Sequence, residues 1–417
     1  MLTNVYPGSF LKYSSLAILG PIANGFASWL INRGYTHLSR REKIALLPYI
    51  EATLIRRGIR HVRQISKADL DACRKSLLRQ FPNRAGTTCA LEKYLHVQSL
   101  LRSTEQKETS AAARYLTSYT RYLRAVRGAA ASTIQQNSYT ASEFLAHLRI
   151  DEHPGRLKTV TINDLEAFVK KISQRLSRAS LRQIAGRLRS FLRFLAVAGE
   201  IPQGLDRQID TPRVYQEEQL PGVLPWETVQ TFLNSIDRSN TLGLRDFTMF
   251  FLMATYGLRA SDVAALTLDN IHWRASKISI SQRKTGIILE LPLTDAVGTA
   301  LHRYLKKAPP PPPFRQIFLR MKAPIGTLKT TAISTAFRVW VRRSGLDISG
   351  RGSCHRIRHS YAVSLLRKGT PIKTISDLLG HCTLESTWTY LRLAIEDLRG
   401  VALPVPTESN GQKAVRA

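Results

Sequence analysis

Six side chains in the C-terminal half of the chain could act together on a phosphate group. They are Arg259, Lys284, His355, Arg358, His381 and Tyr390. Two arginines from distant segments can offer planar, bidentate donors to phosphate oxygens. A tyrosine hydroxyl has an ordinary pKa near 10, so it attacks well only where cations and histidines ease its deprotonation. Together these residue types point to cleavage of a phosphodiester by a protein nucleophile.

The remaining requirements of that chemistry can also be met from the sequence. Negative charge that develops on the non-bridging oxygens needs fixed positive charge, which the two arginines carry. The departing oxygen needs a proton, and a lysine on a hairpin turn can deliver it. The sequence contains nothing that resembles a carboxylate cage for Mg²⁺. We therefore expect no metal and no other cofactor.

The motifs around these residues resemble those of the tyrosine recombinase (phage integrase) family. The chain contains Gly257-Leu258-Arg259-Ala260-Ser261-Asp262, a lysine at 284 in a turn, His355-Arg356-Ile357-Arg358, Leu379-Gly380-His381 and then Tyr390. By this resemblance Tyr390 is the nucleophile that forms a 3′-phosphotyrosyl link, and Arg259 and Arg358 clamp the phosphate. Lys284 is then the general acid, and His355 and His381 assist. We expect Asp262 to orient the Arg259 guanidinium.

The resemblance also implies partners and a cellular setting. Family members cut and rejoin double-stranded DNA recombination sites without ATP, because the covalent link stores the energy of the broken bond. A homo-tetramer on synapsed DNA is implied, with accessory recombinases or DNA-bending proteins as further partners, no membrane, and a cytoplasmic, nucleoid-associated location. The long leader before the usual family chain resembles that of transposon and other mobile-element integrases.

The sequence is also compatible with other functions and with other assignments of the site residues. A type IB topoisomerase would share the chemistry, and a non-catalytic helix-turn-helix DNA-binding protein would share the charge and the helices over 370–390. Arg283 competes with Lys284 as the general acid, and His359 reads as a structural histidine. Cys354-His355 and His381-Cys382 resemble metal-ligand pairs, but their spacing fits no familiar zinc site.

The elements that must carry these residues are indicated by local signals. An apolar helix over 242–256 should end at Gly257. Strands are expected over Lys277–Ser281 and Ile287–Leu293, around a turn that holds Lys284. Helices should fill most of 331–398, including one opened by Thr370-Pro371 and closed by Gly380, which places His381 on a turn.

The first two hundred residues are expected to form two similar helical units. Trp29-Leu30 and Arg33-Gly34 are echoed by Tyr122-Leu123 and Arg127-Gly128. Ile65–Leu70 is echoed by Val160–Leu165, and each of these segments has a Ser or Thr three residues before an Asp, typical of a capped helix. We predict two tandem small helical modules, the second of which is rich in arginine.

The charge of the chain predicts a polyanionic partner. Among its 417 residues, 61 Lys+Arg stand against 30 Asp+Glu, a net charge of +31. In the second module a cationic helix face with almost no acidic i,i+4 partners is expected to contact DNA phosphates. Its members are Arg175, Arg178, Arg182, Arg187, Arg189 and Arg193.

The local signals together with the family resemblance imply a mainly α fold with helical N-terminal and core-binding domains, and a mostly α catalytic domain with a small antiparallel sheet. The expected parts are a helical N-terminal domain over 1–105 that is a second DNA-contacting module, a SAM-like core-binding domain over 110–207, a linker over 208–222, a catalytic domain over 223–400 and a tail over 401–417. Four scattered cysteines predict a reduced chain without a disulfide framework, and 16–31 reads as a core helix rather than a membrane span.

Overall fold

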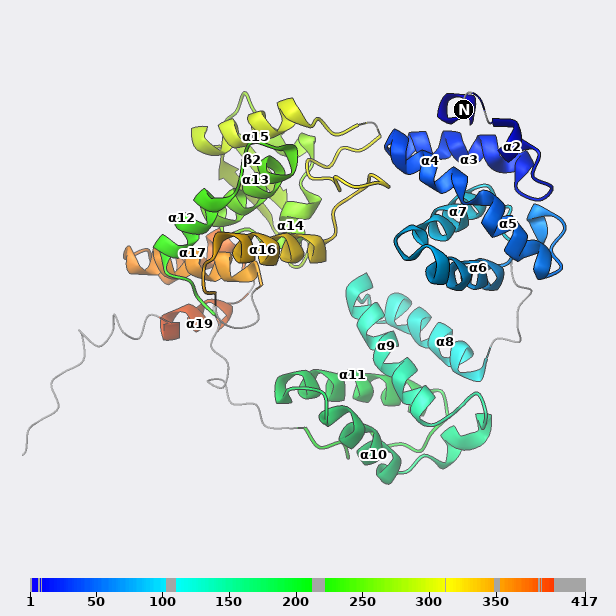
Figure 1. Ribbon diagram of the computed structural model, residues 1–417. Helices are drawn as coiled ribbons and strands as arrows, with labels where there is room; N and C mark the ends of the chain where they lie inside the picture. The colour runs from blue at the N-terminus through cyan, green and yellow to red at the C-terminus, as the bar shows by residue number, and fades with distance from the viewer. Residues whose placement is uncertain are drawn as a thin grey trace, which may run out of the picture. The chain divides into compact units, whose positions relative to one another are not determined.

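A computed structural model gives the arrangement of the chain (Figure 1). It describes residues 2–6, 8, 10–102, 110–211, 222–311, 313–348, 353–381, 383 and 385–393. The expected linker over 208–222 lies partly outside these residues, and the expected tail over 401–417 lies wholly outside them.

The secondary structure confirms the predicted mainly α fold with one small antiparallel sheet. The helices of the first half are α1 (Leu2–Val5), α2 (Phe10–Ser14), α3 (Gly20–Asn32), α4 (His37–Ala45), α5 (Leu47–Arg56), α6 (Lys67–Gln80), α7 (Gly86–Val97), α8 (Ala111–Ala125), α9 (Ala131–His147), α10 (Ile162–Ser173) and α11 (Arg178–Val197). Those of the second half are α12 (Trp226–Ser235), α13 (Thr241–Tyr256), α14 (Ala260–Ala265), α15 (Asp295–Lys307), α16 (Thr330–Ser344), α17 (His355–Arg367), α18 (Ile372–Leu379) and α19 (Glu385–Leu393). Short 3₁₀ turns are η1 (Val62–Gln64), η2 (Pro82–Arg84), η3 (Pro154–Thr159) and η4 (Leu268–Asn270).

Contacts divide the chain into two compact units. One comprises Met1–Pro48 and Leu220–Ala417, and the other comprises Tyr49–Gln219. The division falls within α5. The apolar segment that raised the membrane question forms α3, which buries Ile22, Phe26 and Leu30. Among the described residues, no helix is long and apolar enough to span a lipid bilayer.

The segments around Trp29-Leu30 and Tyr122-Leu123, which resemble each other in sequence, also share local structure. In α3, the rings of Phe26 and Trp29 stack with their centroids 6.2 Å apart, and in α8 the rings of Tyr119 and Tyr122 do so at 6.5 Å. Each helix is followed by a glycine in the left-handed region, Gly34 at φ 74° and Gly128 at φ 57°.

The second echo is also reproduced in three dimensions. Ser66 caps α6 and Thr161 caps α10, each in a reciprocal capping box with the aspartate three residues later. In both segments that aspartate also forms an ion pair with an arginine. Asp69 pairs with Arg57 at 2.8 Å, and Asp164 pairs with Arg156 at 3.1 Å. The local structure of 20–97 therefore follows that of 111–197.

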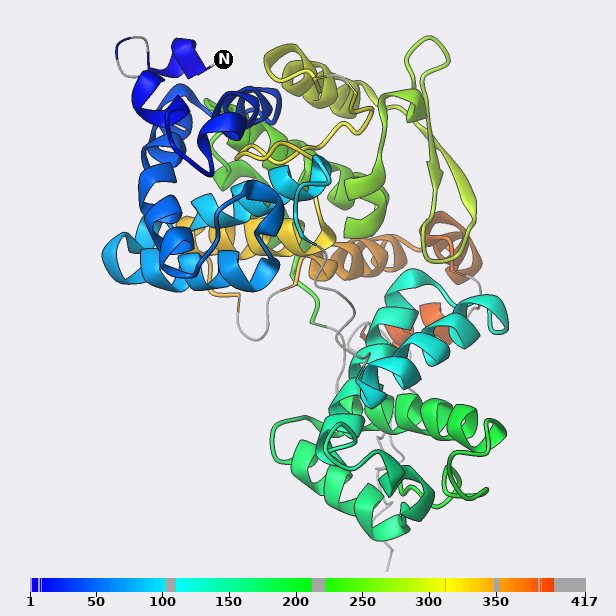
Figure 2. The same ribbon diagram turned by 90° about the vertical axis from the view of Figure 1, so that its right-hand side faces the viewer.

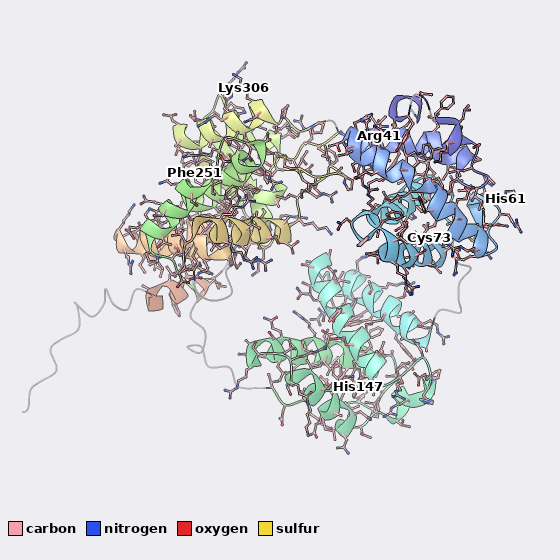
Figure 3. All side chains as sticks on the ribbon, in the orientation of Figure 1. Arg41, His61, Cys73, His147, Phe251 and Lys306 are labelled. Atoms are coloured by element: carbon pink, nitrogen blue, oxygen red, sulfur yellow. The ribbon has the colours of Figure 1, made fainter. Side chains whose placement is uncertain are left out.

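Helices α8 to α11 enclose one apolar core because each carries an apolar stripe at helical spacing. Phe144, Leu188 and Phe191 are fully buried in this core. His147, labelled in Figure 3, lies against Phe168 with ring centroids 5.5 Å apart. The arginines of α11 are left on its other sides.

The second half packs its helices around α13 and the sheet. The sheet has the order β1 (Ile271–His272), β2 (Lys277–Ser281), β3 (Ile288–Pro292), and both pairings are antiparallel. Figure 2 shows β2 and β3 side by side in one hairpin. Helix α15 buries Leu301 and Tyr304, while Lys306 points outward (Figure 3). The predicted strands and the predicted end of α13 are confirmed.

Two left-handed glycines end the helices that flank the candidate site. Gly257 (φ 63°) follows α13 and Gly380 (φ 60°) follows α18. A Cβ on Gly257 would lie 2.5 Å from Tyr361 Cδ1 and 2.8 Å from Leu379 Cδ2. Both the backbone conformation and the close approach therefore require glycine at this position.

We expect Gly257→Ala to destabilise the protein by about 2–4 kcal/mol, because it adds overpacking to the left-handed strain. Gly345→Ala is the matched control, since Gly345 also ends a helix at φ 67° but a Cβ there would meet nothing within 4 Å. That control should lose only about 1–2 kcal/mol. Urea unfolding measures both, and equal losses would contradict the packing argument.

Candidate active site

Arg358 lies at the centre of the candidate site. Helix α17 carries it one turn after His355, and its side chain is only 2% exposed. Its guanidinium donates to Gly257 O at 2.6 Å and to Leu379 O at 2.8 Å. Burial, and then the neighbouring charge of Arg259, lower the pKa of Arg358 to about 10, so it stays charged at neutral pH. A buried cation fixed by backbone carbonyls is preorganised to meet an anion.

Arg259 reaches the same place from the start of α14. Its guanidinium donates to Gly380 O at 3.4 Å and to the amide oxygen of Gln282. Asp262, which we expected to orient it, lies 4.0 Å away as an ion pair, beyond hydrogen-bond length. Asp262 Oδ1 instead accepts from the backbone N–H of Arg283 at 3.2 Å.

The C-terminal end of α18 gathers both arginines. Its last carbonyls, at Leu379 and Gly380, accept from Arg358 and Arg259 respectively. Carbonyls at a helix C-terminus have no partner within the helix and carry partial negative charge, so they suit cations. The glycine that ends this helix therefore also sets the two guanidinium groups side by side.

His381 follows Gly380 directly and contacts Arg358. Its Nε2 lies 2.9 Å from an Arg358 nitrogen, and its Nδ1 lies 2.8 Å from Thr387 Oγ1. A guanidinium can only donate, so Nε2 accepts and the ring proton resides on Nδ1, from which it is donated to Thr387. Burial and the charge of Arg358 lower the pKa of His381 to about 4, which agrees with a neutral ring.

Tyr390 lies on α19 with its side chain 3% exposed. Its hydroxyl is 3.2 Å from His359 Nδ1, and its ring belongs to one buried apolar cluster with Val363, Ile375 and Leu379. Burial raises the pKa of Tyr390, while the charge of Arg358 and a hydrogen bond from it act in the opposite direction. The phenol oxygen is thus in reach of Arg358 and beside a nitrogen that can accept its proton.

His355 and Lys284 lie toward the surface of this cluster. The ring of His355 meets the ring of His359 edge-on, with centroids 5.3 Å apart. Partial desolvation and then the charges of Arg358, Arg259 and Lys284 lower the pKa of His355. Lys284 is exposed in the turn between β2 and β3. All six side chains predicted from the sequence therefore belong to one neighbourhood.

Three contacting residues were not singled out as functional from the sequence. Gln282 bonds Arg259, Thr387 bonds His381, and His359, which we read as structural, bonds Tyr390. Only Thr387 had a local signal, since it precedes Tyr390 by three residues and shares its helix face. The zinc alternative gains no support from Cys354, whose Sγ lies 3.4 Å from Ser334 Oγ, and Cys382 lies outside the described residues.

Comparison with known proteins identifies the family. The phage integrase family matches residues 223–396, and the phage integrase N-terminal SAM-like domain matches residues 116–199. A protein of Sinorhizobium fredii (strain NBRC 101917 / NGR234) named as integrase/recombinase y4rA is 31% identical over 403 residues, 94% of this chain and 96% of that protein. The chain belongs to the phage integrase family of tyrosine recombinases.

Other similar proteins agree with this assignment. Tyrosine recombinase XerD of Listeria monocytogenes is 28% identical over 282 residues, 66% of this chain and 92% of XerD. Lambda integrase (75–356), solved as a dimer bound to a core site, matches with a TM-score of 0.52 at 18% identity, over 65% of this chain and 95% of that chain. The latter likeness shows the fold. As a tyrosine recombinase, the protein is an enzyme that cleaves and rejoins DNA in site-specific recombination, which confirms the predicted function.

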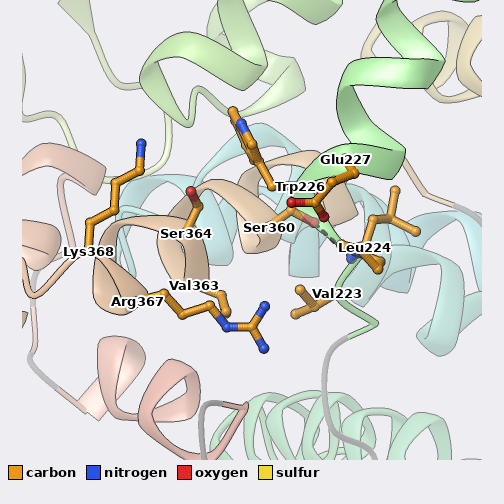
Figure 4. Close-up of a pocket in the computed structure, with 10 residues that line it drawn as sticks. Val223, Leu224, Trp226, Glu227, Ser360, Val363, Ser364, Arg367 and Lys368 are labelled. Atoms are coloured by element: carbon orange, nitrogen blue, oxygen red, sulfur yellow. Dashed lines mark hydrogen bonds between the residues drawn. The ribbon is translucent and has the colours of Figure 1, made fainter. Parts of the chain in front are cut away.

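A pocket of the recombinase lies on another face of α17 (Figure 4). It has a volume of about 400 Å³ and is lined by residues 223–227 and by Ser360, Val363, Ser364, Arg367 and Lys368. Ser360 Oγ accepts from Leu224 N at 2.8 Å, which ties the segment before α12 to α17. None of the six predicted side chains is among the described residues that line it.

The arginines predicted to bind DNA differ in how they are engaged. Arg175 lies in the turn before α11 and pairs with Glu143 at 2.6 Å, and Arg193 pairs with Asp206 at 3.4 Å. Arg189 donates to Ile209 O at 2.6 Å. The sequence shows almost no acidic partners at i,i+4 on this helix face, and the acidic partners of these two arginines come instead from other elements. Arg187 bonds Gln136 at 2.5 Å, and Arg178 and Arg182 are exposed.

Two half-buried histidines predict acid sensitivity of the recombinase fold. The pKa of His359 and the pKa of His381 are both lowered to about 4, chiefly by burial, from an ordinary 6.5. Between these values the unfolded chain binds protons that the folded chain does not, so stability falls as the pH drops from 6.5 to 4. When the pH is lowered from 7 to 4.5, the melting temperature of His359→Gln should fall by less than that of the native protein. His302→Gln on α15 is the control, and an identical loss in both variants would refute the assignment.

Proposed function

We propose that this recombinase cleaves one DNA strand by attack of the Tyr390 hydroxyl on the scissile phosphorus. The observation that carries the proposal is the convergence of Arg259 and Arg358 on the end of α18, with the Tyr390 hydroxyl beside them. The two guanidinium groups would exchange some of their carbonyl partners for the non-bridging oxygens of the phosphate. Fixed positive charge would then meet the charge that develops in the transition state.

The bonds and protons of the step can be assigned to this chain's own groups. The Tyr390 Oη–P bond forms while the P–O5′ bond breaks, which leaves a 3′-phosphotyrosyl link. The phenol proton leaves toward His359 Nδ1, the acceptor 3.2 Å away. Lys284 gives a proton to the departing O5′, while His355 and His381 hydrogen-bond the phosphate. Rejoining is the reverse attack by a 5′ hydroxyl, with the negative charge on the non-bridging oxygens balanced by protein cations and with no ATP or cofactor.

We also propose that the chain is divided into five parts. The parts would be an N-terminal domain over 1–105, a core-binding domain over 110–207, a linker over 208–222, a catalytic domain over 223–400 and a tail over 401–417. The family matches at 116–199 and 223–396 fit the second and fourth of these. The shared local structure of 20–97 and 111–197 supports a second DNA-contacting module at the N-terminus.

Assembly and setting are proposed by likeness to relatives. A lambda integrase structure is a tetramer bound to a Holliday junction, and a transposon integrase (Tn1549, residues 82–397) is solved with circular intermediate DNA at a TM-score of 0.51 and 16% identity. We accordingly propose a homo-tetramer on synapsed DNA, a role in the movement of a mobile element, accessory recombinases or DNA-bending partners, and action at the nucleoid in the cytoplasm.

Paired-site plasmids test the function as a whole. The DNA on both sides of the gene is first searched for inverted repeats that can serve as candidate sites, and product formation should depend on two sites in one reaction. Supercoil relaxation by a monomer without any dependence on paired sites would instead indicate a topoisomerase. Specific binding without a covalent adduct under any condition would indicate a DNA-binding protein that is not an enzyme.

Salt dependence tests the cationic face of the second module. Each phosphate contact contributes a slope of about −0.9 to the plot of log affinity against log salt. Arg182→Gln removes an exposed arginine of α11, and the slope should flatten by about one. Arg175→Gln, whose guanidinium already pairs with Glu143, should change the slope less. An unchanged slope in Arg182→Gln would exclude this residue from the DNA interface.

A further inference from the structure

A single buried amide joins three segments of the candidate site. Gln282 is 1% exposed at the end of β2, two residues before Lys284. Its Nε2 donates to Leu379 O at 2.9 Å, and its Oε1 accepts from Arg259 and, at 2.9 Å, from Thr285 Oγ1. The side chain therefore contacts the α18 end, the first arginine and the lysine turn at once.

The backbone of Gln282 also closes that turn. Its N–H donates to Ile287 O and its carbonyl accepts from Gly286 N, both at 2.8 Å. Asp262 Oδ1 accepts from Arg283 N beside it. Main-chain bonds thus shape the turn, while the side chains of Gln282 and Asp262 attach it to other described segments of the site.

Glutamine suits this position because both ends of its amide are used. An amide offers a donor and an acceptor together, whereas a carboxylate cannot donate and an apolar side chain can do neither. The neighbouring helix end is shaped to admit it, since a Cβ on Gly380 would lie 2.3 Å from Gln282 Nε2. The left-handed glycine therefore both ends α18 and makes room for the amide.

We propose that Gln282 is a positioning residue that holds the Lys284 turn in register with Arg259 and the end of α18. It acts so that the Lys284 ammonium meets the O5′ leaving oxygen of the phosphate that Arg259 binds. This inference rests on the proposed role of Lys284 as proton donor. A misplacement of about 1 Å at a reacting group can cost about 100-fold in rate, so a single amide contact can matter to the chemistry.

A substrate with sulfur in place of the bridging O5′ tests this directly. When the P–S bond breaks, the thiolate departs without needing a proton, because thiols are far more acidic than alcohols. The measured quantity is the ratio of single-turnover cleavage rates on the sulfur and oxygen forms of one nicked duplex that spans the recombination site. Both rates come from the same preparation of the full-length protein, so any loss of folded protein cancels in the ratio.

The expected results separate the amide from the lysine. Lys284→Ala should raise the sulfur-to-oxygen ratio by about 100-fold. Gln282→Met, and Gln282→Leu as a second apolar variant, should raise it about tenfold or more. Ser281→Ala, on the exposed neighbour in β2, is the matched control and should leave the ratio unchanged.

Two opposite outcomes have different meanings. If Lys284→Ala raises the ratio but both Gln282 variants slow the two substrates equally, Gln282 acts only through Arg259 or the fold, and the inference is overturned. If Lys284→Ala leaves the ratio unchanged, the proposed proton donor itself is wrong, and the inference falls with it.

Discussion

Tyr390→Phe is expected to abolish the covalent protein–DNA adduct on a nicked suicide substrate. The substitution removes the only atom that can form the phosphotyrosyl link, so cleavage should fall by about 10⁴-fold or more. The ring stays in the buried cluster with Val363, Ile375 and Leu379, and only the hydrogen bonds of the hydroxyl with His359 and Arg358 are lost. DNA binding should therefore change by no more than about threefold, which a gel-shift titration measures.

The matched control is Tyr361→Phe. Tyr361 lies on α17 against the same apolar cluster, and burial raises its pKa as it does that of Tyr390. A general loss of packing or of phenol chemistry would affect both variants. Adduct formation that persists in Tyr390→Phe, or that disappears in Tyr361→Phe, would show that a different tyrosine carries the reaction.

Local signals in the sequence were sufficient for the elements that hold the site. Gly257 and Gly380 were predicted to end helices, and both do so in the left-handed conformation. The hairpin around Lys284 followed from alternating strand residues on either side of a turn. Such features depend on neighbours within a few residues, which is why the sequence alone reveals them.

Contacts between distant segments could not be predicted in this way. Gln282 meets Leu379 across 97 residues of chain, and Arg189 bonds the carbonyl of Ile209 rather than standing free for DNA. Helical periodicity places an arginine on a polar face but does not say which carbonyl or carboxylate lies opposite. Helical spacing likewise placed Asp262 near Arg259, with which it forms an ion pair at 4.0 Å, but it could not show that an amide from the hairpin takes the closer position.

Arg358→Lys is the second substitution with a large expected effect. Arg358 satisfies Gly257 O through one terminal nitrogen, and Leu379 O and His381 Nε2 through the other terminal nitrogen of the same planar group. A lysine ammonium keeps the charge but cannot reproduce that fork or the bidentate grip on phosphate. Cleavage per folded molecule should fall by about 100-fold or more, while DNA affinity stays within about threefold.

Because buried acceptors are left unpaired, Arg358→Lys should also lose about 1–3 kcal/mol of stability, and that loss must be separated from the catalytic one. Arg245→Lys provides the comparison. Arg245 is a buried arginine outside the site that bonds Asp246 and Leu319 O, so its replacement by lysine should destabilise the fold similarly. Measured per folded molecule, Arg245→Lys should cleave like the native protein. If the two variants lose cleavage in equal measure, the defect belongs to the fold, and the guanidinium of Arg358 is not the clamp on the scissile phosphate.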